Sequence, residues 1–475
     1  MFVLSLLVIE HQPVPLTLVS PRTSPDTAHL LGAALGALLA ALLGSYLGRK
    51  TSLLAACLPD TLGWALVAAT SILPSPATLP LLVTGRALTG LAAGAYLSTI
   101  QTFVAELVQT EHRGWMGGLA LPIGSIGVMA MYVLGSWLSW ADTALVCTLP
   151  PLLLALALAF LWDSPYSLLL RGKDKEAHLA MDQLREGDPG AMAELFAIQN
   201  YVNNHTFEGG VLTKLRFLCT QKKYYSPFFI LNFLIIIILF TGITTMNLYA
   251  NELFQRAGGH MDLYLSNILI GLVQLVGCCL FLPLVKAYSR KLLLVFSSLV
   301  MACSLALLGL YLYSQTRQED FFLAVGESSW LAILCFSTFL AAAPTGLCSI
   351  PLLYTAELFP TELRSLLSGL TVLLAALGLL VARLVFPGLE AVLLPHGIVW
   401  LGAAACVVAI LFTLSAIPET RHKELSQIPE KLAAWRKEAR ASPWVTPMPS
   451  PSHSRCTTPS RETKKFDFRS HMFTK

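Results

Sequence analysis

The chain has 475 residues, of which 55% are hydrophobic and only 13% are charged, and its mean hydropathy is +0.65. Soluble domains carry about 25% charged residues, so this composition excludes a single soluble globular core. The formal net charge of +4 gives no indication of a nucleic-acid partner, and we expect none.

The N-terminal segment, residues 1–27, is too short for a complete spanning helix. Its apolar start, from Met1 to Ile9, would rise only about 14 Å as a helix, and Glu10 and Pro13 then interrupt it. No basic region precedes the apolar stretch and no clean cleavage site of small residues follows, which argues against a signal peptide. We therefore expect a truncated or irregular first helix here.

Eleven later stretches are apolar enough to cross roughly 30 Å of hydrocarbon as helices of about 20 residues. They fall at 28–48, 52–73, 79–104, 115–137, 143–162, 228–250, 264–285, 292–314, 330–356, 365–387 and 395–416. The pattern predicts an all-α membrane protein with an N-terminal bundle over 28–162 and a C-terminal bundle over 228–417.

Two polar regions complete the predicted organisation. Residues 163–227 form a linker whose apolar spacing predicts short helices on the membrane surface. Residues 418–475 form a basic tail rich in Pro, Ser and Thr, for which we expect disorder. Lys and Arg gather in the linker, in the tail and in alternate connections, so the positive-inside rule predicts that linker and C-terminus are cytoplasmic.

The two bundles contain a repeated motif. The segments AELVQTEHRG at 105–114 and AELFPTELRS at 356–365 share six residues in register, and GRK at 48–50 mirrors SRK at 289–291. Two spans separate each basic segment from its Glu-x6-Arg motif. Two parallel halves joined by a cytoplasmic linker are the plan of a major-facilitator transporter. In this arrangement the second half has one helix for which the first half has no full-length partner.

The Glu-x6-Arg motif places its two charges on one helical face. Seven residues are two turns, so Glu106 faces the same way as Arg113, and Glu357 the same way as Arg364. Two interpretations stay open. The arginines anchor the helix ends at the membrane interface, or the charges form a cluster that rearranges when the carrier alternates between its two open states. The matched copies favour the second.

Several segments together resemble the sugar-transporter family of the major facilitator superfamily, particularly its facilitative glucose and insect trehalose carriers. They are GRALTGLAAGAYLSTIQTFVAELVQTEHRG, DSPYSLLLRGKDKEAHLAMDQLR, GITTMNLYANELFQRAG, ELFPTELR and PETRHKEL, and the likeness spans roughly residues 28–425. The resemblance implies the major-facilitator fold, solute transport by alternating access, and no cofactor or metal. It also implies a cytoplasmic charge gate made of Arg86, Glu106, Arg113, Arg290, Glu357, Arg364 and Glu419.

The sequence departs from the family motifs at the gate. The first basic loop, Ser45 to Lys50, lacks the family's Asp, and the second, Lys286 to Lys291, lacks it too. The family's Pro-Glu-Ser-Pro-Arg motif is replaced by the segment 162–166. Half of the gate's charge partners are therefore changed.

The sugar site departs further. The positions that the resemblance assigns to sugar-binding amides and indoles hold Leu121, Ile238, Leu239, Thr244, Leu352, Ala375 and Ala376. A sugar hydroxyl buried without a hydrogen-bond partner costs about 1–3 kcal/mol, so these replacements argue against hexose binding in the family manner. Gln274 keeps a family-like amide.

Polar residues inside the spans supply the cavity candidates, which are Thr241, Thr244, Asn247, Tyr249 and Gln274. A Ser or Thr hydroxyl in a membrane helix is more often satisfied by its own backbone, and the amides serve either as contacts between helices or as solute ligands. Asp60 is either a proton site or a hydrated residue near a helix end.

The sequence thus predicts a solute carrier of the plasma membrane that moves a sugar or related small solute. It contains no nucleotide site, metal cluster or nucleophile triad, so we expect no enzyme activity. Two alternatives stay open. One is a transport-deficient member acting as sensor, scaffold or incomplete gene product, and the other is a carrier of a less polar or organic-ion solute.

Overall fold

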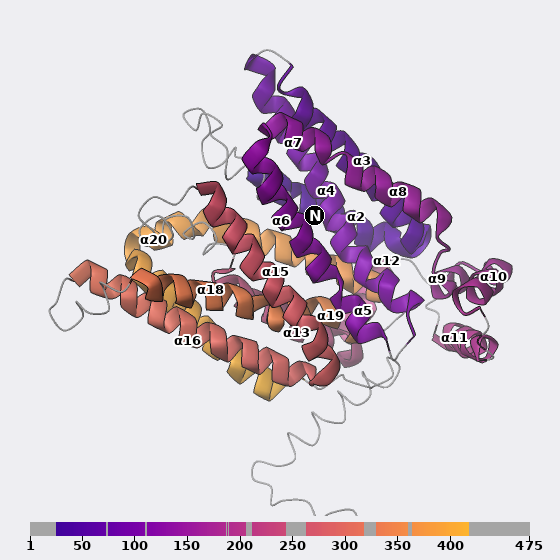
Figure 1. The fold of residues 1–475 in the computed structure, drawn as a ribbon. Helices are drawn as coiled ribbons and strands as arrows, with labels where there is room; N and C mark the ends of the chain where they lie inside the picture. The colour runs from indigo at the N-terminus through magenta and orange to yellow at the C-terminus, as the bar shows by residue number, and fades with distance from the viewer. Residues whose placement is uncertain are drawn as a thin grey trace, which may run out of the picture. The chain divides into compact units, whose positions relative to one another are not determined.

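The computed structural model describes residues 25–72, 75–109, 112–186, 188, 190–205, 211–243, 263–317, 329–359 and 363–417. Within these ranges the regular elements are α-helices (Figure 1).

The first half contains five spanning segments. They are α2 (Pro25–Leu47), α3 (Arg49–Ala69), α4 (Ser75–Leu107), α5 (Arg113–Gly118) with α6 (Ala120–Trp137), and α7 (Trp140–Val146) with α8 (Leu149–Phe160). Gly48 separates α2 from α3 with φ of 85°, a conformation that glycine adopts without steric cost. α8 starts with prolines in its first turn, where their missing N–H groups break no helical hydrogen bond.

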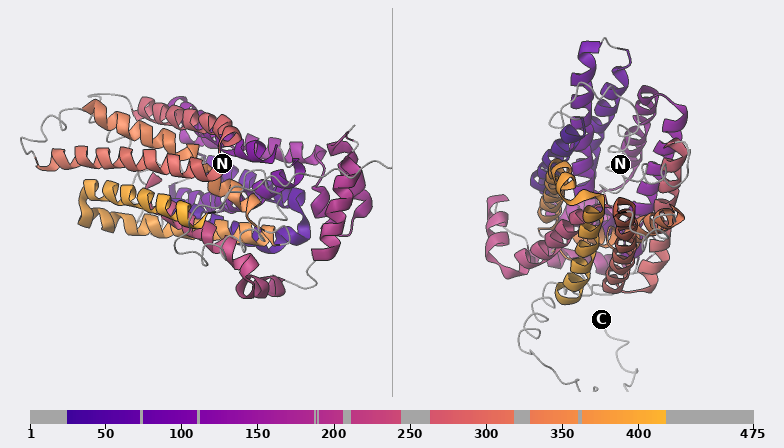
Figure 2. Two further views of the ribbon diagram at one scale, coloured as in Figure 1. Left: turned by 90° about the horizontal axis from the view of Figure 1, so that it is seen from below. Right: turned by 90° about the vertical axis from the view of Figure 1, so that its left-hand side faces the viewer.

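The linker forms four short helices, α9 (Pro165–Leu170), α10 (Asp174–Leu184), α11 (Ala191–His205) and α12 (Val211–Thr220). Buried apolar residues such as Leu169, Met181 and Leu195 pack α9, α10 and α11 into a small core of their own. In the left view of Figure 2 the spanning helices run in similar directions and these linker helices lie across one end. We call this the linker end of the bundle.

The second half contains α13 (Lys222–Phe240), α15 (Leu263–Ala287), α16 (Arg290–Arg317), α18 (Ser329–Thr345) with α19 (Ser349–Glu357), and α20 (Arg364–Ala416). α20 is two spans joined at Leu394, whose φ is 60°. Leu394 precedes a proline, and the proline ring disfavours helical backbone at that position. The kink therefore falls where the sequence predicts the break between two spans.

Ten helices are long and apolar enough to span a membrane in the part of the chain that the structure describes. Each matches one predicted span within a few residues. The stretch predicted at 228–250 is represented by the shorter apolar helix Tyr224–Phe240, and its last residues are outside the described part. α13 begins at Lys222, inside the predicted linker, and α2 begins at Pro25, inside the predicted N-terminal segment. The tail at 418–475 is outside the described residues.

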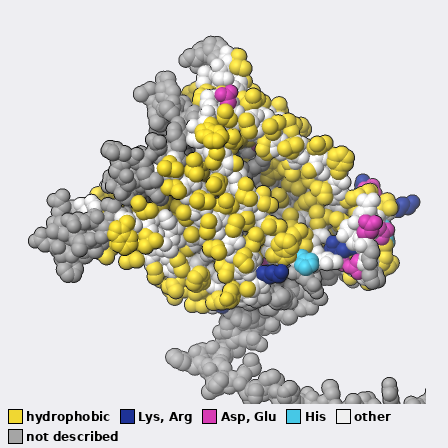
Figure 3. All heavy atoms as spheres, viewed as in Figure 1, with side chains coloured by type: hydrophobic (Ala, Val, Ile, Leu, Met, Phe, Trp, Pro, Cys, Tyr) yellow, Lys and Arg dark blue, Asp and Glu magenta, His cyan; other side chains and the backbone are white. Residues whose placement is uncertain are grey.

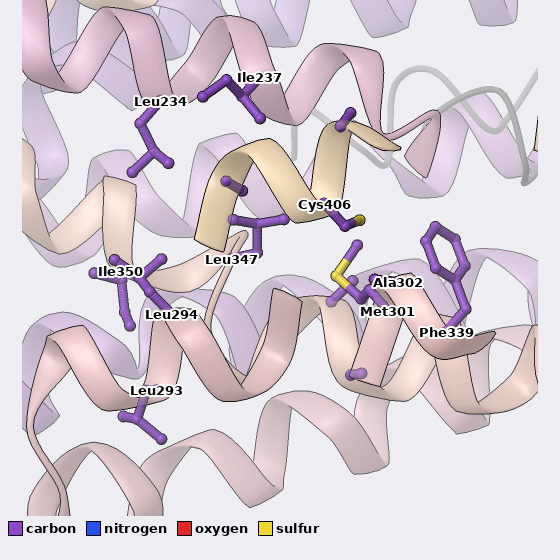
Figure 4. Close-up of a cluster of buried hydrophobic side chains, with 14 of the residues drawn as sticks. Leu234, Ile237, Leu293, Leu294, Met301, Ala302, Phe339, Leu347, Ile350 and Cys406 are labelled. Carbon is purple, nitrogen blue, oxygen red and sulfur yellow. The ribbon is translucent and has the colours of Figure 1, made fainter. Parts of the chain in front are cut away.

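The two halves meet mainly along two pairs of helices, α2 with α20 and α6 with α15. The largest core lies in the second half, where side chains of α13, α16, α18, α19 and α20 converge, among them Leu234, Met301, Phe339 and Cys406 (Figure 4). Leucines and phenylalanines also cover much of the outer surface (Figure 3). An apolar exterior of this extent is typical of helices surrounded by lipid.

Candidate functional site

Each half holds one buried ion pair at the linker end, at equivalent places in the repeat. Nη2 of Arg49, the first residue of α3, lies 3.2 Å from Oε1 of Glu106 on α4. Nη2 of Arg290, the first residue of α16, lies 3.2 Å from Oε1 of Glu357 on α19. The glutamates therefore pair with the basic loop of their own half, and each pair fixes the ends of two helices to each other.

The arginines of the Glu-x6-Arg motifs have other roles. Arg364 is 1% exposed, and its Nε and Nη2 each donate to the carbonyl of Phe359 at 3.3 Å, which ties the start of α20 to the end of α19. Arg113 begins α5, but its side chain is outside the described part. Glu419 is outside it as well.

One contact at the linker end crosses between the halves. The guanidinium of Arg290 lies against Gly114 of α5, so closely that a Cβ on Gly114 would collide with Nη2 of Arg290. The Arg290–Glu357 pair is thus positioned where it can respond to separation of the two halves.

The structure does not bring Arg86 together with the charges of the linker end. Arg86 is fully buried on α4, and its Nη2 lies 3.4 Å from Oδ1 of Asp26 at the start of α2. Arg86 and Glu106 are separated by about 30 Å along α4, roughly the thickness of the hydrocarbon layer. The family resemblance is what implies a gate role for Arg86, and a likeness of motifs does not fix the end of the bundle at which a side chain lies.

The linker is fastened to the first half by Arg171. Its guanidinium pairs with the carboxylate of Asp163, and its Nη1 donates to the carbonyl of Leu47 at 3.1 Å. Lys50 donates through Nζ to the carbonyl of Leu161 at 2.6 Å. The altered family motif at 162–166 therefore still supplies an acidic partner at this place.

Lys214 on α12 lies close enough to this end to be affected by its charge. Burial of the side chain lowers the pKa of Lys214 below its ordinary value, and the positive charge of Arg49 lowers it further. The linker end therefore carries an unfavourable like-charge interaction besides its ion pairs.

Thr241 lies at the end of α13 and is fully buried. Its hydroxyl donates to the carbonyl of Ile238 at 2.6 Å, so its own helix satisfies it. Gly402 of α20 packs against the carbonyl of Thr241.

Of the other predicted cavity residues, Gln274 is half-buried on α15. Thr244, Asn247 and Tyr249 are outside the described residues.

Aliphatic and small residues pack α20 against α13 of its own half and against α2 of the other half. Leu239 packs against Gly378, where a Cβ would come within 2.5 Å of Leu239 Cδ1. Ala376 is buried against Ala33 and Ala34 of α2. Leu239 and Ala376, two of the positions at which the family resemblance implies polar ligands, are thus used here for helix packing.

Two buried polar contacts between helices were missed by sequence reasoning. Asn232 on α13 donates through Nδ2 to Thr371 Oγ1 on α20 at 3.4 Å. Ser368 on α20 donates to the carbonyl of Ser98 on α4 at 2.8 Å, which joins the two halves. Asn232 interrupts an apolar run, and this isolated amide was the available signal.

Asp60 is not a hydrated residue near a helix end. It is 4% exposed and lies in the middle of α3, past Pro59. Buried carboxyl groups at membrane depth are costly, which leaves a protonatable group as the interpretation.

A cavity of about 760 Å³ lies at the linker end, between α4, α5 and the start of α6. Gln101, Val104 and Trp115 belong to its wall, and Arg185 of the linker contributes to its rim. The amide of Gln101 is 5% exposed, with Nε2 3.5 Å from the carbonyl of Gly117. Its volume suits a small solute, and its wall is mostly apolar. Thr241 and Gln274 do not line it.

The described residues contain no cluster of three or more His, Cys, Asp or Glu side chains able to hold a metal. Their cysteines are all free thiols. The chemistry available within the described part is therefore that of hydrogen bonds, ion pairs and apolar contact.

A family model described as "Sugar (and other) transporter" matches residues 27–432. Facilitated trehalose transporter Tret1 of Anopheles gambiae is 27% identical over 388 residues, which are 81% of this chain but 47% of that protein. The Tret1 protein of Bombyx mori is 26% identical over 393 residues, 83% of this chain and 75% of the relative. The chain thus spans about half the length of the first relative and three quarters of the second.

Solved structures with the same fold are known. The proton:xylose symporter XylE bound to 6-bromo-6-deoxy-D-glucose superposes with a TM-score of 0.73 at 22% identity, covering 88% of this chain and 89% of XylE. The E. coli fucose:proton symporter FucP superposes with a TM-score of 0.52 at 13% identity, covering 84% of this chain and 91% of FucP. At these identities the likeness establishes the fold alone.

Proposed function

Since the chain belongs to the family of sugar and other transporters, we propose that it carries a sugar or a related small solute across a membrane by alternating access. The observation that carries this proposal is the pair of equivalent ion pairs, Arg49–Glu106 and Arg290–Glu357, one in each half. Charges placed at equivalent sites of two halves, beside an interface between them, are suited to rearrangement as the halves move.

The relatives suggest trehalose as the first solute to test, since they are named as trehalose transporters. Thr244, Asn247, Tyr249 and Gln274 are proposed to line the solute path, together with Thr241 at the end of α13. Arg290, Glu357, Glu106, Arg364, Arg113 and Glu419 are proposed to form the gate at the linker end.

We further propose that the protein acts at the plasma membrane with its linker and C-terminus in the cytoplasm and that it has no enzyme activity. The accumulation of Lys and Arg in the linker supports this orientation. Lipid is its surrounding medium, as the exposed leucines of the spanning helices suggest.

A carrier of a less polar solute is the second candidate. It is favoured by apolar contacts at positions where the family resemblance implies polar ligands, Leu239 with Gly378 inside the second half and Ala376 with Ala33 between the halves. A bulky polyhydroxylated solute at that level would need the amides that are absent from these positions.

Uptake into vesicles that contain the purified protein separates these candidates. Labelled trehalose, glucose and a less polar solute of similar size are compared with protein-free vesicles. Saturable uptake of a sugar supports the first candidate, and uptake of the less polar solute alone supports the second. No flux of any solute, from protein that is folded and inserted, would refute both and favour a sensor or scaffold.

A further inference from the structure

A buried carboxylate joins the two halves at the end of the bundle opposite the linker. Asp26, in the first turn of α2, is 4% exposed. Its Oδ2 lies 2.7 Å from Nη2 of Arg383 on α20, and its Oδ1 lies 3.4 Å from Nη2 of Arg86 on α4. Arg86 belongs to the same half as Asp26, whereas Arg383 belongs to the other. The carboxylate therefore bridges the boundary between the halves.

The position of this bridge follows from the helices that carry it. Arg383 lies about 29 Å along α20 from Arg364, which is at the linker end. Arg86 lies about 30 Å along α4 from Glu106. Both distances are close to the thickness of the hydrocarbon layer, so the bridge and the linker-end ion pairs occupy opposite ends.

Between these ends, α2 and the first part of α20 form a continuous antiparallel seam. The contacts, in order from the linker end, are Gly44 with Ser365, Ala41 with Gly369, Ala34 with Ala376, and Asp26 with Arg383. The residue numbers rise on one helix as they fall on the other, as two antiparallel helices in constant register require. The seam is closed along its whole length.

The free energy needed to separate α2 from α20 differs between the two ends of this seam. Contacts of Gly44 and Ala41 are small and largely apolar, and lipid or solute can replace them. Parting Asp26 from Arg383 leaves a buried carboxylate without one of its two cationic partners, which is unfavourable unless it finds a new one. Along this seam, the contacts toward the linker end are therefore the easier ones to part, although Ser368 with Ser98 and Arg290 with Gly114 also join the halves at that end.

The first half holds the carboxylate in position. His29, fully buried on α2, lies with Nδ1 3.3 Å from the carbonyl of Arg86 and 3.3 Å from Thr89 Oγ1, which fixes the start of α2 to α4. Arg86 contacts the other oxygen of Asp26. Arg383, at 36% side-chain exposure, is the member of the cluster that can withdraw.

We propose that the Asp26–Arg383 ion pair is the closing contact of the carrier at the end opposite the linker. It holds that end shut while the seam parts at the linker end, and its rupture is the step that opens the opposite end. This inference rests on the proposed alternating access.

The test measures access to the middle of the seam. Ala376, 2% exposed, is replaced by Cys in the full chain, which is reconstituted in vesicles and treated with a membrane-impermeant maleimide from the side opposite the linker. Mass spectrometry of the peptide containing residue 376 gives the labelling rate. We expect Asp26→Asn and Arg383→Gln to raise this rate at least fivefold, and Arg383→Lys to raise it less than Arg383→Gln.

Lys173→Gln is the matched control, because Lys173 pairs with Glu176 in an exposed ion pair of the linker. Its labelling rate should equal that of the parent. If Asp26→Asn does not fold, Arg383→Gln decides the result, since its side chain is partly exposed. Parent-like labelling of folded Arg383→Gln, or an equal rise in the Lys173→Gln control, would overturn the proposal.

The labelling does not require a transported solute. A rise in labelling without uptake of any solute would retain the closing contact and refute the carrier function. Uptake with unchanged labelling would retain the carrier and refute the closing contact.

Discussion

The guanidinium of Arg290 lies between Glu357 of its own half and Gly114 of the other. Because α5 approaches it without a side chain at residue 114, the ion pair can sit directly at the boundary between the halves. A methyl group there would displace the guanidinium from Glu357.

We therefore expect Gly114→Ala to slow solute uptake and to lower stability by about 1 kcal/mol, as overpacking of a close contact does. Gly124→Ala is the control, since a Cβ at Gly124 meets no atom within 4 Å. Uptake rates and thermal unfolding of both variants check this. Equal behaviour of the two variants would contradict the role given to the Arg290 contact.

The ion pairs of the two halves should be equivalent in stability. Glu106→Gln and Glu357→Gln each leave a buried arginine without its carboxylate, for which we expect a loss of about 3 kcal/mol. Thermal unfolding in detergent measures the loss. Glu176→Gln, in an exposed pair, should cost less than about 1 kcal/mol. A similar loss in all three variants would show that burial of the pairs is unimportant.

Gln274 is proposed to contact the solute, and its replacement should lower uptake. Losing an amide hydrogen bond to a bound sugar costs about 1–3 kcal/mol, so Gln274→Leu should reduce kcat/KM for uptake about tenfold or more. Gln315→Leu is the control, because Gln315 bonds to Tyr311 of its own helix, α16, and is not one of the proposed path residues. Unchanged uptake by Gln274→Leu would remove this residue from the solute path.

Lys214 should make the stability of the folded protein depend on pH. Its pKa is lowered in the folded protein, so between the folded and the unfolded pKa the unfolded chain binds more protons and stability rises with pH. Below the folded pKa the full destabilisation is present. We expect Lys214→Gln to raise the unfolding temperature near neutral pH and to flatten its increase toward pH 10. A variant with the parent's pH profile would contradict this.

The spans were predictable because hydropathy is a local property of the sequence, and the break at Leu394 carries a local proline signal. The partners of the buried ion pairs were not predictable from local sequence in the same way. The prediction that Glu106 and Arg113 share a helix face was wrong, because α4 ends at Leu107 and α5 begins at Arg113. Glu106 pairs instead with Arg49, because tertiary packing of α3 on α4 decides which charge is near. The repeated Arg-Lys segments at 49–50 and 290–291 were the sequence feature that indicated the partners of the two glutamates.

Asp26 could not be recognised as a functional residue from its local context. It falls in a segment with Pro and Thr that reads as the end of an irregular N-terminus. Its partner Arg383 is distant in sequence, and only the antiparallel seam brings the two together. Proline in the first position and an acid in the first turn are nevertheless ordinary features of a helix start.

The constant register of α2 against α20 gives the molecule a lever. With the Asp26–Arg383 contact as pivot, each helix is an arm of about 30 Å, so a relative tilt of about 20° would part the linker end by about 10 Å. The displacement falls to zero toward the pivot. A solute would thus pass a wedge-shaped opening whose width at each level is set by its distance from one carboxylate, and solute size would be sorted by depth along the seam.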